Sequence, residues 1–167
     1  MKHFVAIILT AAGACALQAQ NPLSTELKGG YTGIKNNLLK MAEKMPEENY
    51  SFKPTPDIRT FGQLVGHIAD SQMRGCSAIN GEPKQAGAAS KTSKADLEAA
   101  LKASFDECDK AYDSLTDDTA AKMIKLGQRE STKLGALARN VIHDNEEYGY
   151  MSVYLRLKGI VPPSSAK

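Results

Sequence analysis

The chain has 167 residues, a length that suits a single domain with a hydrophobic core of its own. Hydrophobic residues make up 42% and charged residues 24%, as in an ordinary globular protein. The formal charge is only +2 and tryptophan is absent, so neither a basic nucleic-acid surface nor an aromatic stacking platform is indicated, and we expect no nucleic-acid partner.

Residues 1–19 have the pattern of a secretory signal peptide. A basic start precedes an apolar run over residues 4–9, and Ala14-Cys15-Ala16 supplies small residues at cleavage spacing. The run is too short to anchor the mature chain in a bilayer. We expect cleavage between Ala16 and Gln20, export to the periplasm or cell envelope, and no stable membrane anchor after processing.

Two other interpretations of this segment are weaker. Lipoprotein processing at Cys15 is disfavoured because Ala12 stands where such signals usually carry leucine. A buried N-terminal helix is disfavoured because Asn21-Pro22 interrupts the apolar pattern.

Two amphipathic helices are expected in the first half of the mature chain. The first runs from about Ser24 until Pro46 stops it, with apolar residues in alternating steps of four and three. An ordered loop follows over residues 46–57, pinned to the core by its aromatic residues, and Thr60 then caps a second helix that Asn80-Gly81 closes. The two inward stripes consist of Leu27, Tyr31, Ile34, Leu38, Met41 and Met45, and of Phe61, Leu64, Val65, Ile68, Cys76 and Ile79.

Two further helices are expected in the second half. A long connection over residues 82–93 ends at Ser93, which caps the third helix, and the fourth begins near Thr132 and ends at Gly159. Their stripes consist of Leu97, Leu101, Phe105, Cys108, Tyr112 and Leu115, and of Leu134, Leu137, Val141, Tyr148, Met151 and Leu155. No segment alternates with period two over a typical strand length. We therefore predict an all-α fold, a four-helix bundle over residues 23–161 with a flexible tail at 162–167.

The long connection and the two cysteines of the mature chain bear on how the second and third helices run. An extended chain over residues 82–93 can cross about 40 Å, which allows a parallel pair. Cys76 lies sixteen residues after Thr60 and Cys108 fourteen after Lys94, so they stand at about 24 and 21 Å along their helices. A parallel pair would bring them level for a disulfide, and two buried thiols that never pair are the alternative.

The residues themselves offer two histidines as candidate metal ligands, and one of them pairs with a glutamate. His67 lies within the second helix and His143 within the fourth, and either alone is more often a hydrogen-bonded or exposed histidine than a ligand. His143 and Glu147 are i and i+4, so they leave one helix face a turn apart and can chelate one ion. A solvated acidic face, with Asp144 and Glu146 nearby, is the alternative for this stretch.

Three passages of the chain resemble the DinB/YfiT-like family of small helical-bundle proteins. They are residues 54–61 (PTPDIRTF), residues 62–69 (GQLVGHIA), and residues 143–156, which begin HDNEEYG and end YLR. The resemblance covers nearly all of the mature region. It implies an up-down-down-up bundle in which the second and third helices are parallel.

The resemblance also implies a metal site. In that family a divalent metal is typically held by one histidine on the second helix and an H-x-x-x-H pair on the last. His67 and His143 match this pattern, whereas Glu147 stands where the family has histidine. Either the carboxylate oxygen of Glu147 makes the ligand set harder than one with histidine, or its presence marks a family member that has lost its metal.

Two histidines and a carboxylate suit zinc, which we favour, and also nickel, iron or manganese. Three ligands leave a coordination position for water or substrate. Some family members resemble thiol-dependent S-transferases, but export argues against that activity because low-molecular-weight thiols are chiefly cytoplasmic. Gln63, Asp70 and Tyr154 are candidates for positioning or proton handling, although each also suits a surface or packing role.

Three kinds of function stay open. The chain is a metal-dependent transferase or hydrolase acting on a small molecule, a non-catalytic metal-binding or stress-associated protein that can be a homodimer, or an interaction bundle without metal. Family resemblance supplies the site but neither the substrate nor the reaction.

Overall fold

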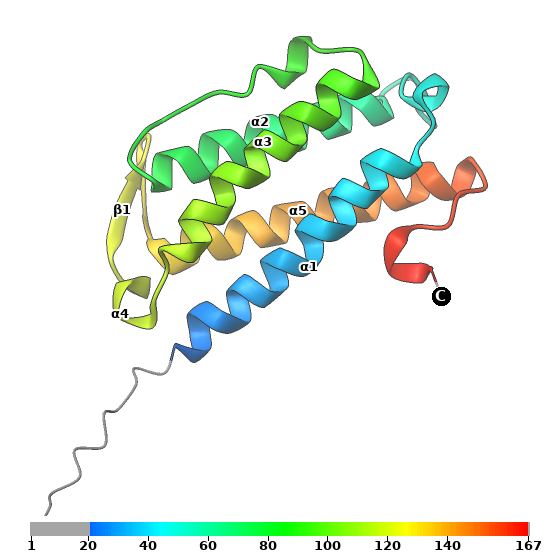
Figure 1. The fold of residues 1–167 in the computed structure, drawn as a ribbon. Helices are drawn as coiled ribbons and strands as arrows, with labels where there is room; N and C mark the ends of the chain where they lie inside the picture. Colours follow the sequence, from blue (N-terminus) through cyan, green and yellow to red (C-terminus); the bar gives the residue numbers. More distant parts are fainter. Residues whose placement is uncertain (1–20, 167) are drawn as a thin grey trace, which may run out of the picture.

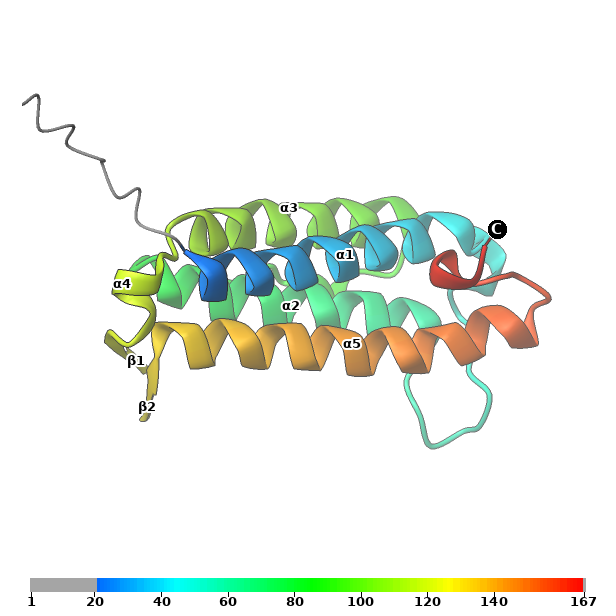
Figure 2. The same ribbon diagram turned by 90° about the horizontal axis from the view of Figure 1, so that it is seen from below.

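The computed structural model describes residues 21–166, most of which are helical. Four long helices lie side by side around one core (Figure 1; Figure 2). They are α1 (Pro22–Lys44), α2 (Phe61–Ile79), α3 (Lys94–Asp113) and α5 (Lys133–Leu157). The predicted all-α class is confirmed, whereas the predicted leader lies outside the described residues. No helix within residues 21–166 is long and apolar enough to cross a membrane.

Shorter elements connect the long helices. They are α4 (Asp117–Ala120), β1 (Met123–Leu126), β2 (Arg129–Thr132) and three single 3-10 turns at Glu47–Asn49, Ala88–Ser90 and Pro163–Ser165. The last turn is held to α5 by a hydrogen bond of 2.7 Å from the hydroxyl of Tyr148 to that of Ser164. Flexibility of the tail stays a prediction.

The prediction of a chain without strands is wrong at one place. β1 and β2 form an antiparallel hairpin in which Met123 faces Thr132 and Leu126 faces Arg129. Gly127 opens the two-residue turn with a φ of 64°, as glycine does at the first position of a type II′ hairpin. The strands are four residues each and none of their residues is buried, so they are too short to give the sustained alternation that identifies a half-buried strand in the sequence.

Side-chain caps place the helix starts near the predicted residues. The Thr60 hydroxyl accepts from the N–H of Gln63, whose side-chain oxygen accepts from the N–H of Thr60, and this capping box begins α2. Ser93 and Thr132 cap α3 and α5 through their hydroxyls. α1 begins two residues earlier than predicted, at Pro22, because the fixed φ of proline suits the first helical position.

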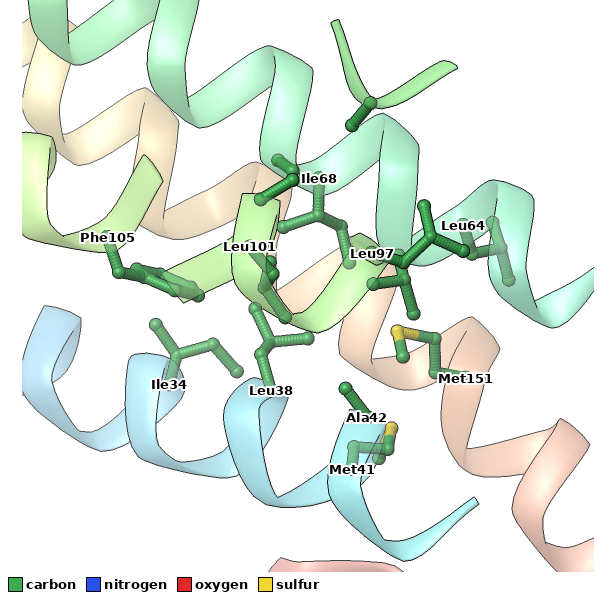
Figure 3. Close-up of a cluster of buried hydrophobic side chains, with 14 of the residues drawn as sticks. Ile34, Leu38, Met41, Ala42, Leu64, Ile68, Leu97, Leu101, Phe105 and Met151 are labelled. Atoms are coloured by element: carbon green, nitrogen blue, oxygen red, sulfur yellow. The ribbon is translucent and has the colours of Figure 1, made fainter. Parts of the chain in front are cut away.

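The predicted apolar stripes meet in one core. Figure 3 shows side chains from the four long helices converging, among them Leu38, Leu101 and Met151, which are all fully buried. The loop before α2 is pinned to this core as predicted. Its Tyr50 is buried and donates a hydrogen bond of 2.8 Å to the main-chain oxygen of Ala42.

α2 and α3 run in the same direction, opposite to α1 and α5 (Figure 1). The connection between α2 and α3 crosses the length of the molecule, which is what a parallel pair needs. Cys76 and Cys108 stand level on the two helices, with Cα atoms 4.9 Å apart, and form a buried disulfide. The prediction that Cys76 and Cys108 pair, which came from their distances along the two helices, is therefore confirmed.

A buried carboxylate fastens the start of this connection to α3. Glu107 is 5% exposed and accepts hydrogen bonds from Asn80 (2.7 Å), Lys110 (2.9 Å) and Lys84 (3.2 Å). These donors, Asn80 foremost, lower the pKa of Glu107 to about 2. The carboxylate therefore stays ionised over most of the acid range.

Replacing Cys76 and Cys108 by alanine should lower the free energy of unfolding by about 3–4 kcal/mol. The disulfide closes a sequence separation of 32 residues, and its loss frees that loop in the unfolded chain. Urea unfolding followed by circular dichroism measures the change. Wild-type protein treated with a reductant should lose a similar amount, and a variant as stable as the oxidised protein would contradict the prediction.

Glu107→Gln should flatten the acid dependence of stability. Because folding lowers the pKa of Glu107 from its ordinary 4.5 to about 2, its ionised form stabilises the fold above pH 4.5. That contribution, about 1–3 kcal/mol for a buried charged hydrogen-bond acceptor, is lost as the pH falls from 4.5 toward 2. Unfolding midpoints at pH 5 and pH 2.5 should thus differ less in the variant than in the wild type. Glu43→Gln, at an exposed position, is the control and should keep the wild-type difference.

Candidate metal centre

The three predicted ligand residues come together between α2 and α5. Nε2 of His67 lies 3.2 Å from Nε2 of His143. Oε1 of Glu147 lies 3.5 Å from the first nitrogen and 3.6 Å from the second. One turn of α5 separates His143 from Glu147, so both side chains leave the helix on the side that faces His67.

The donor atoms fit a divalent cation. Bonds of about 2.0–2.1 Å at the tetrahedral angle put neighbouring ligand atoms about 3.4 Å apart, close to the edges of this triangle. Oε2 of Glu147 is buried and has no hydrogen-bond partner within residues 21–166. An unpaired buried carboxylate oxygen is costly to the fold, and a cation beside it would compensate that cost.

The three side chains differ in exposure. The His67 and His143 side chains are 30% and 28% exposed, whereas that of Glu147 is only 6% exposed. The carboxylate therefore lies on the buried side of the group, and solvent reaches part of both histidine side chains.

Charges and burial act differently on each group. Burial, followed by the charges of Arg59 and His143, lowers the pKa of His67, which favours the neutral ring that a metal needs. The Asp144 carboxylate raises the pKa of His143, and Glu147 adds to that effect. Burial raises the pKa of Glu147.

A chain of buried polar groups supports His143 from behind. Oδ1 of Asp144, a fully buried residue, lies 3.7 Å from Nδ1 of the His143 ring. Oδ2 of Asp144 accepts a hydrogen bond from Gln72, and Gln72 in turn accepts one of 2.8 Å from Asn140. At that distance Oδ1 makes no hydrogen bond to the ring, so Asp144 acts on His143 through its charge. The side-chain oxygen of Gln72 also lies 2.8 Å from Sγ of Cys108, so the chain reaches the disulfide.

The interpretation of this stretch as a solvated acidic face is wrong for two of its three carboxylates. Asp144 and Glu147 are buried, and only Glu146 is exposed. Sequence reasoning missed Asp144 and Gln72 as supporting groups. The position of Asp144 next to His143 was the one available signal, and nothing in the pattern marked Gln72.

The three residues that are candidates for positioning or proton handling each have a structural partner. Gln63 belongs to the capping box of α2. The Asp70 carboxylate accepts two main-chain N–H bonds of 2.9 Å from the turn at Ala88–Ser90. The Tyr154 hydroxyl donates a bond of 2.6 Å to the main-chain oxygen of Arg59.

Comparisons with known proteins agree with this architecture. The sequence model of the DinB superfamily matches residues 32–151. A DinB-like protein from Bacillus cereus ATCC 10987 has a similar structure, with a TM-score of 0.72 and 18% identity over 83% of this chain and 95% of that one. The DinB-like protein YjoA from Bacillus subtilis gives a TM-score of 0.63 and 20% identity over 80% of this chain and 92% of that one. A conserved protein from Enterococcus faecalis gives a TM-score of 0.65 and 15% identity over 80% of this chain and 95% of that one. Identities this low show a shared fold alone. No curated protein sequence matches the chain.

Glu147→Gln should raise the free energy of unfolding of chelator-treated protein at pH 8 by about 1 kcal/mol, since the wild type then keeps an unpaired carboxylate buried. Folding raises the pKa of Glu147, so its charge costs stability above that pKa and the cost disappears as the pH falls through it. The advantage of the variant should therefore shrink at pH 5. Urea unfolding at both pH values measures it, with exposed Glu146→Gln as the control. A variant less stable than the wild type at pH 8 would contradict the prediction.

Proposed function

The chain belongs to the DinB superfamily, and from that premise we propose that it binds one divalent metal ion through His67, His143 and Glu147 and acts with it on a small molecule. The observation that carries the proposal is the triangle of donor atoms, with edges of 3.2, 3.5 and 3.6 Å, drawn from two helices. Zinc is the ion we favour, since it accepts two imidazoles and a carboxylate at such spacing. Nickel, iron and manganese suit the same donors.

Three ligands rather than four support a catalytic site, because structural zinc sites usually close with a fourth protein ligand. A bound cation would supply a Lewis acid at the position that the three side chains leave open. Glu147 would offset part of its charge from the buried side, and the charge of Asp144, behind the His143 ring, would add to that effect. The side chains of His67 and His143 are partly exposed, which lets a substrate approach the site. Group transfer or hydrolysis is the reaction class that fits such a site.

A non-catalytic, metal-binding role is the second candidate. It is favoured by the position of the ligands, since an ion held by His67 of α2 and by His143 and Glu147 of α5 would tie those two helices together. In that case the ion contributes mainly to the free energy of folding.

We also propose that the chain is exported and that its mature form is an up-down-down-up four-helix bundle. The buried disulfide between Cys76 and Cys108 supports export, because disulfides persist mainly in oxidising compartments. The directions of the long helices in Figure 1 support the bundle topology.

Purified protein should carry about one equivalent of divalent metal, measured by plasma mass spectrometry, because the structure brings one set of three donors together. His143→Ala and Glu147→Ala should each weaken metal binding by more than about tenfold, since two donors remain where three stood. Glu146→Ala removes an exposed neighbouring carboxylate and should leave metal binding unchanged. Protein without bound metal, or Glu147→Ala protein that keeps it fully, would overturn the proposal.

The same variants separate the two roles. If the ion is catalytic, the Glu147→Ala variant should lose turnover, and its melting temperature should stay within a few degrees of that of the metal-loaded wild type. If the ion is structural, the melting temperature should fall together with the metal content.

A further inference from the structure

A pocket of about 830 Å³ opens beside the metal centre, and His143 forms part of its wall. Its other walls come from α2, α5, the β1–β2 hairpin and the connection that follows α2. Figure 2 shows the hairpin at the end of the molecule where α5 begins. The volume lies in the range of sites for small ligands.

The lining of this pocket is basic. Arg74, Arg129, Arg139 and Lys84 contribute to it, and no aspartate or glutamate of residues 21–166 does. Lys84 is paired with Glu107 at 3.2 Å and therefore adds little net charge. The pocket is left with three arginine charges on its wall.

These arginines have no acidic partner among residues 21–166. Within the described part of the chain, every ion pair has lysine or histidine as its basic member. Arg74 and Arg139 make side-chain hydrogen bonds only to serine hydroxyls, at 3.4 Å to Ser71 and 3.1 Å to Ser131. Their guanidinium groups keep most of their donors for a ligand.

Helix spacing links the arginines to the metal ligands. Arg74 lies two turns after His67 on α2, and Arg139 lies one turn before His143 on α5. Each arginine thus shares a helix face with a histidine, about 10 Å and about 6 Å of helix rise away. A molecule held by the arginines would extend through the pocket toward His143, which forms part of its wall.

Apolar surface lies between these polar groups. Ile79 and Ala136 line the pocket, and so does Gly75, where an added Cβ atom would meet nothing within 4 Å. The absence of a side chain at Gly75 leaves part of the pocket open. An apolar segment of a ligand therefore has both space and a matching wall.

We propose that this pocket binds an organic anion, a carboxylate or phosphate joined to a short apolar body, and presents it to the metal centre as substrate. The planar guanidinium group matches both kinds of oxyanion in a bidentate manner. The binding of the anion is inferred from the pocket alone. The role of the anion as a substrate rests on the proposed metal function.

Hexanoate, hexyl phosphate and 1-hexanol are the probes, titrated into wild-type protein and followed by isothermal calorimetry or by NMR shifts. At least one of the two anions should bind about tenfold or more tightly than the neutral alcohol. The stronger of the two identifies the oxyanion. Equal affinity for all three probes would overturn the proposal.

Three variants locate the binding. Arg74→Gln and Arg139→Gln should each weaken anion binding by about tenfold, while Arg156→Gln, outside the pocket, should leave it unchanged. Gly75→Leu keeps every charge but fills the pocket, and it should abolish binding. Leucine suits a helix better than glycine, so the fold should persist. Gly33→Leu, on the exposed face of α1, is the matched control. Anion binding that survives both Gly75→Leu and the arginine variants would overturn the proposal.

Metal content, measured on the same samples, separates this proposal from the proposed function. Arg74→Gln and Arg139→Gln protein should keep its metal, and Glu147→Ala protein should still bind the anion through the arginines. If wild-type protein is purified without metal and still binds the anion, the proposed metal function is contradicted and the anion site is supported. If the protein carries metal but binds hexanoate, hexyl phosphate and hexanol equally, the metal function is supported and the anion site is contradicted.

Discussion

The close, parallel packing of α2 on α3 is the constraint from which the rest of the molecule follows. The disulfide between Cys76 and Cys108 holds the two helices level, with the Cα atoms of the two cysteines 4.9 Å apart. A Cβ atom on Gly66 would approach the main-chain oxygen of Ala88 to 3.1 Å, so α2 lies directly against the connection that returns to α3. With α2 held on this side, its remaining face is turned to α5. His67 and Arg74 lie on that face. Gln72 contacts Cys108 of the disulfide through its side-chain oxygen and donates a hydrogen bond to Asp144 of α5.

The candidate site is built at a cost to the fold. Two buried carboxylate oxygens, one from Asp144 and one from Glu147, have no hydrogen-bond partner within residues 21–166. Apolar side chains at these positions would pack without that cost, and they would make α5 a more regular amphipathic helix. Functional sites are commonly where a chain departs from the choices that stability alone would favour. The inward carboxylates of α5 are such a departure, and they lie beside the two partly exposed imidazoles rather than elsewhere in the core.

The features that sequence predicts well are those set by local chemistry. Thr60, Ser93 and Thr132 have short hydroxyl side chains that pair with helix N–H groups wherever they stand, so the helix starts were visible. The spacing of His143 and Glu147 predicts a shared face, and family resemblance added His67. Burial of Asp144 could not be read, because a carboxylate among other carboxylates resembles a hydrated surface until its neighbours in space are known. The absence of an ion pair at Arg74 and Arg139 depends likewise on which acids lie nearby in three dimensions. The hairpin strands, at four residues each, are too short for a period to be recognised.

The covalent bond between α2 and α3 has a consequence for how the molecule tolerates damage. The connection from Glu82 to Ser93 is mostly exposed, and such segments are where proteases cut folded chains. Both ends of that segment lie between the two cysteines in the sequence. A single cut there would yield two polypeptides that stay joined until a reductant separates them. The nicked form would still hold His67 on one piece and His143 with Glu147 on the other, so the two fragments would behave as one protein.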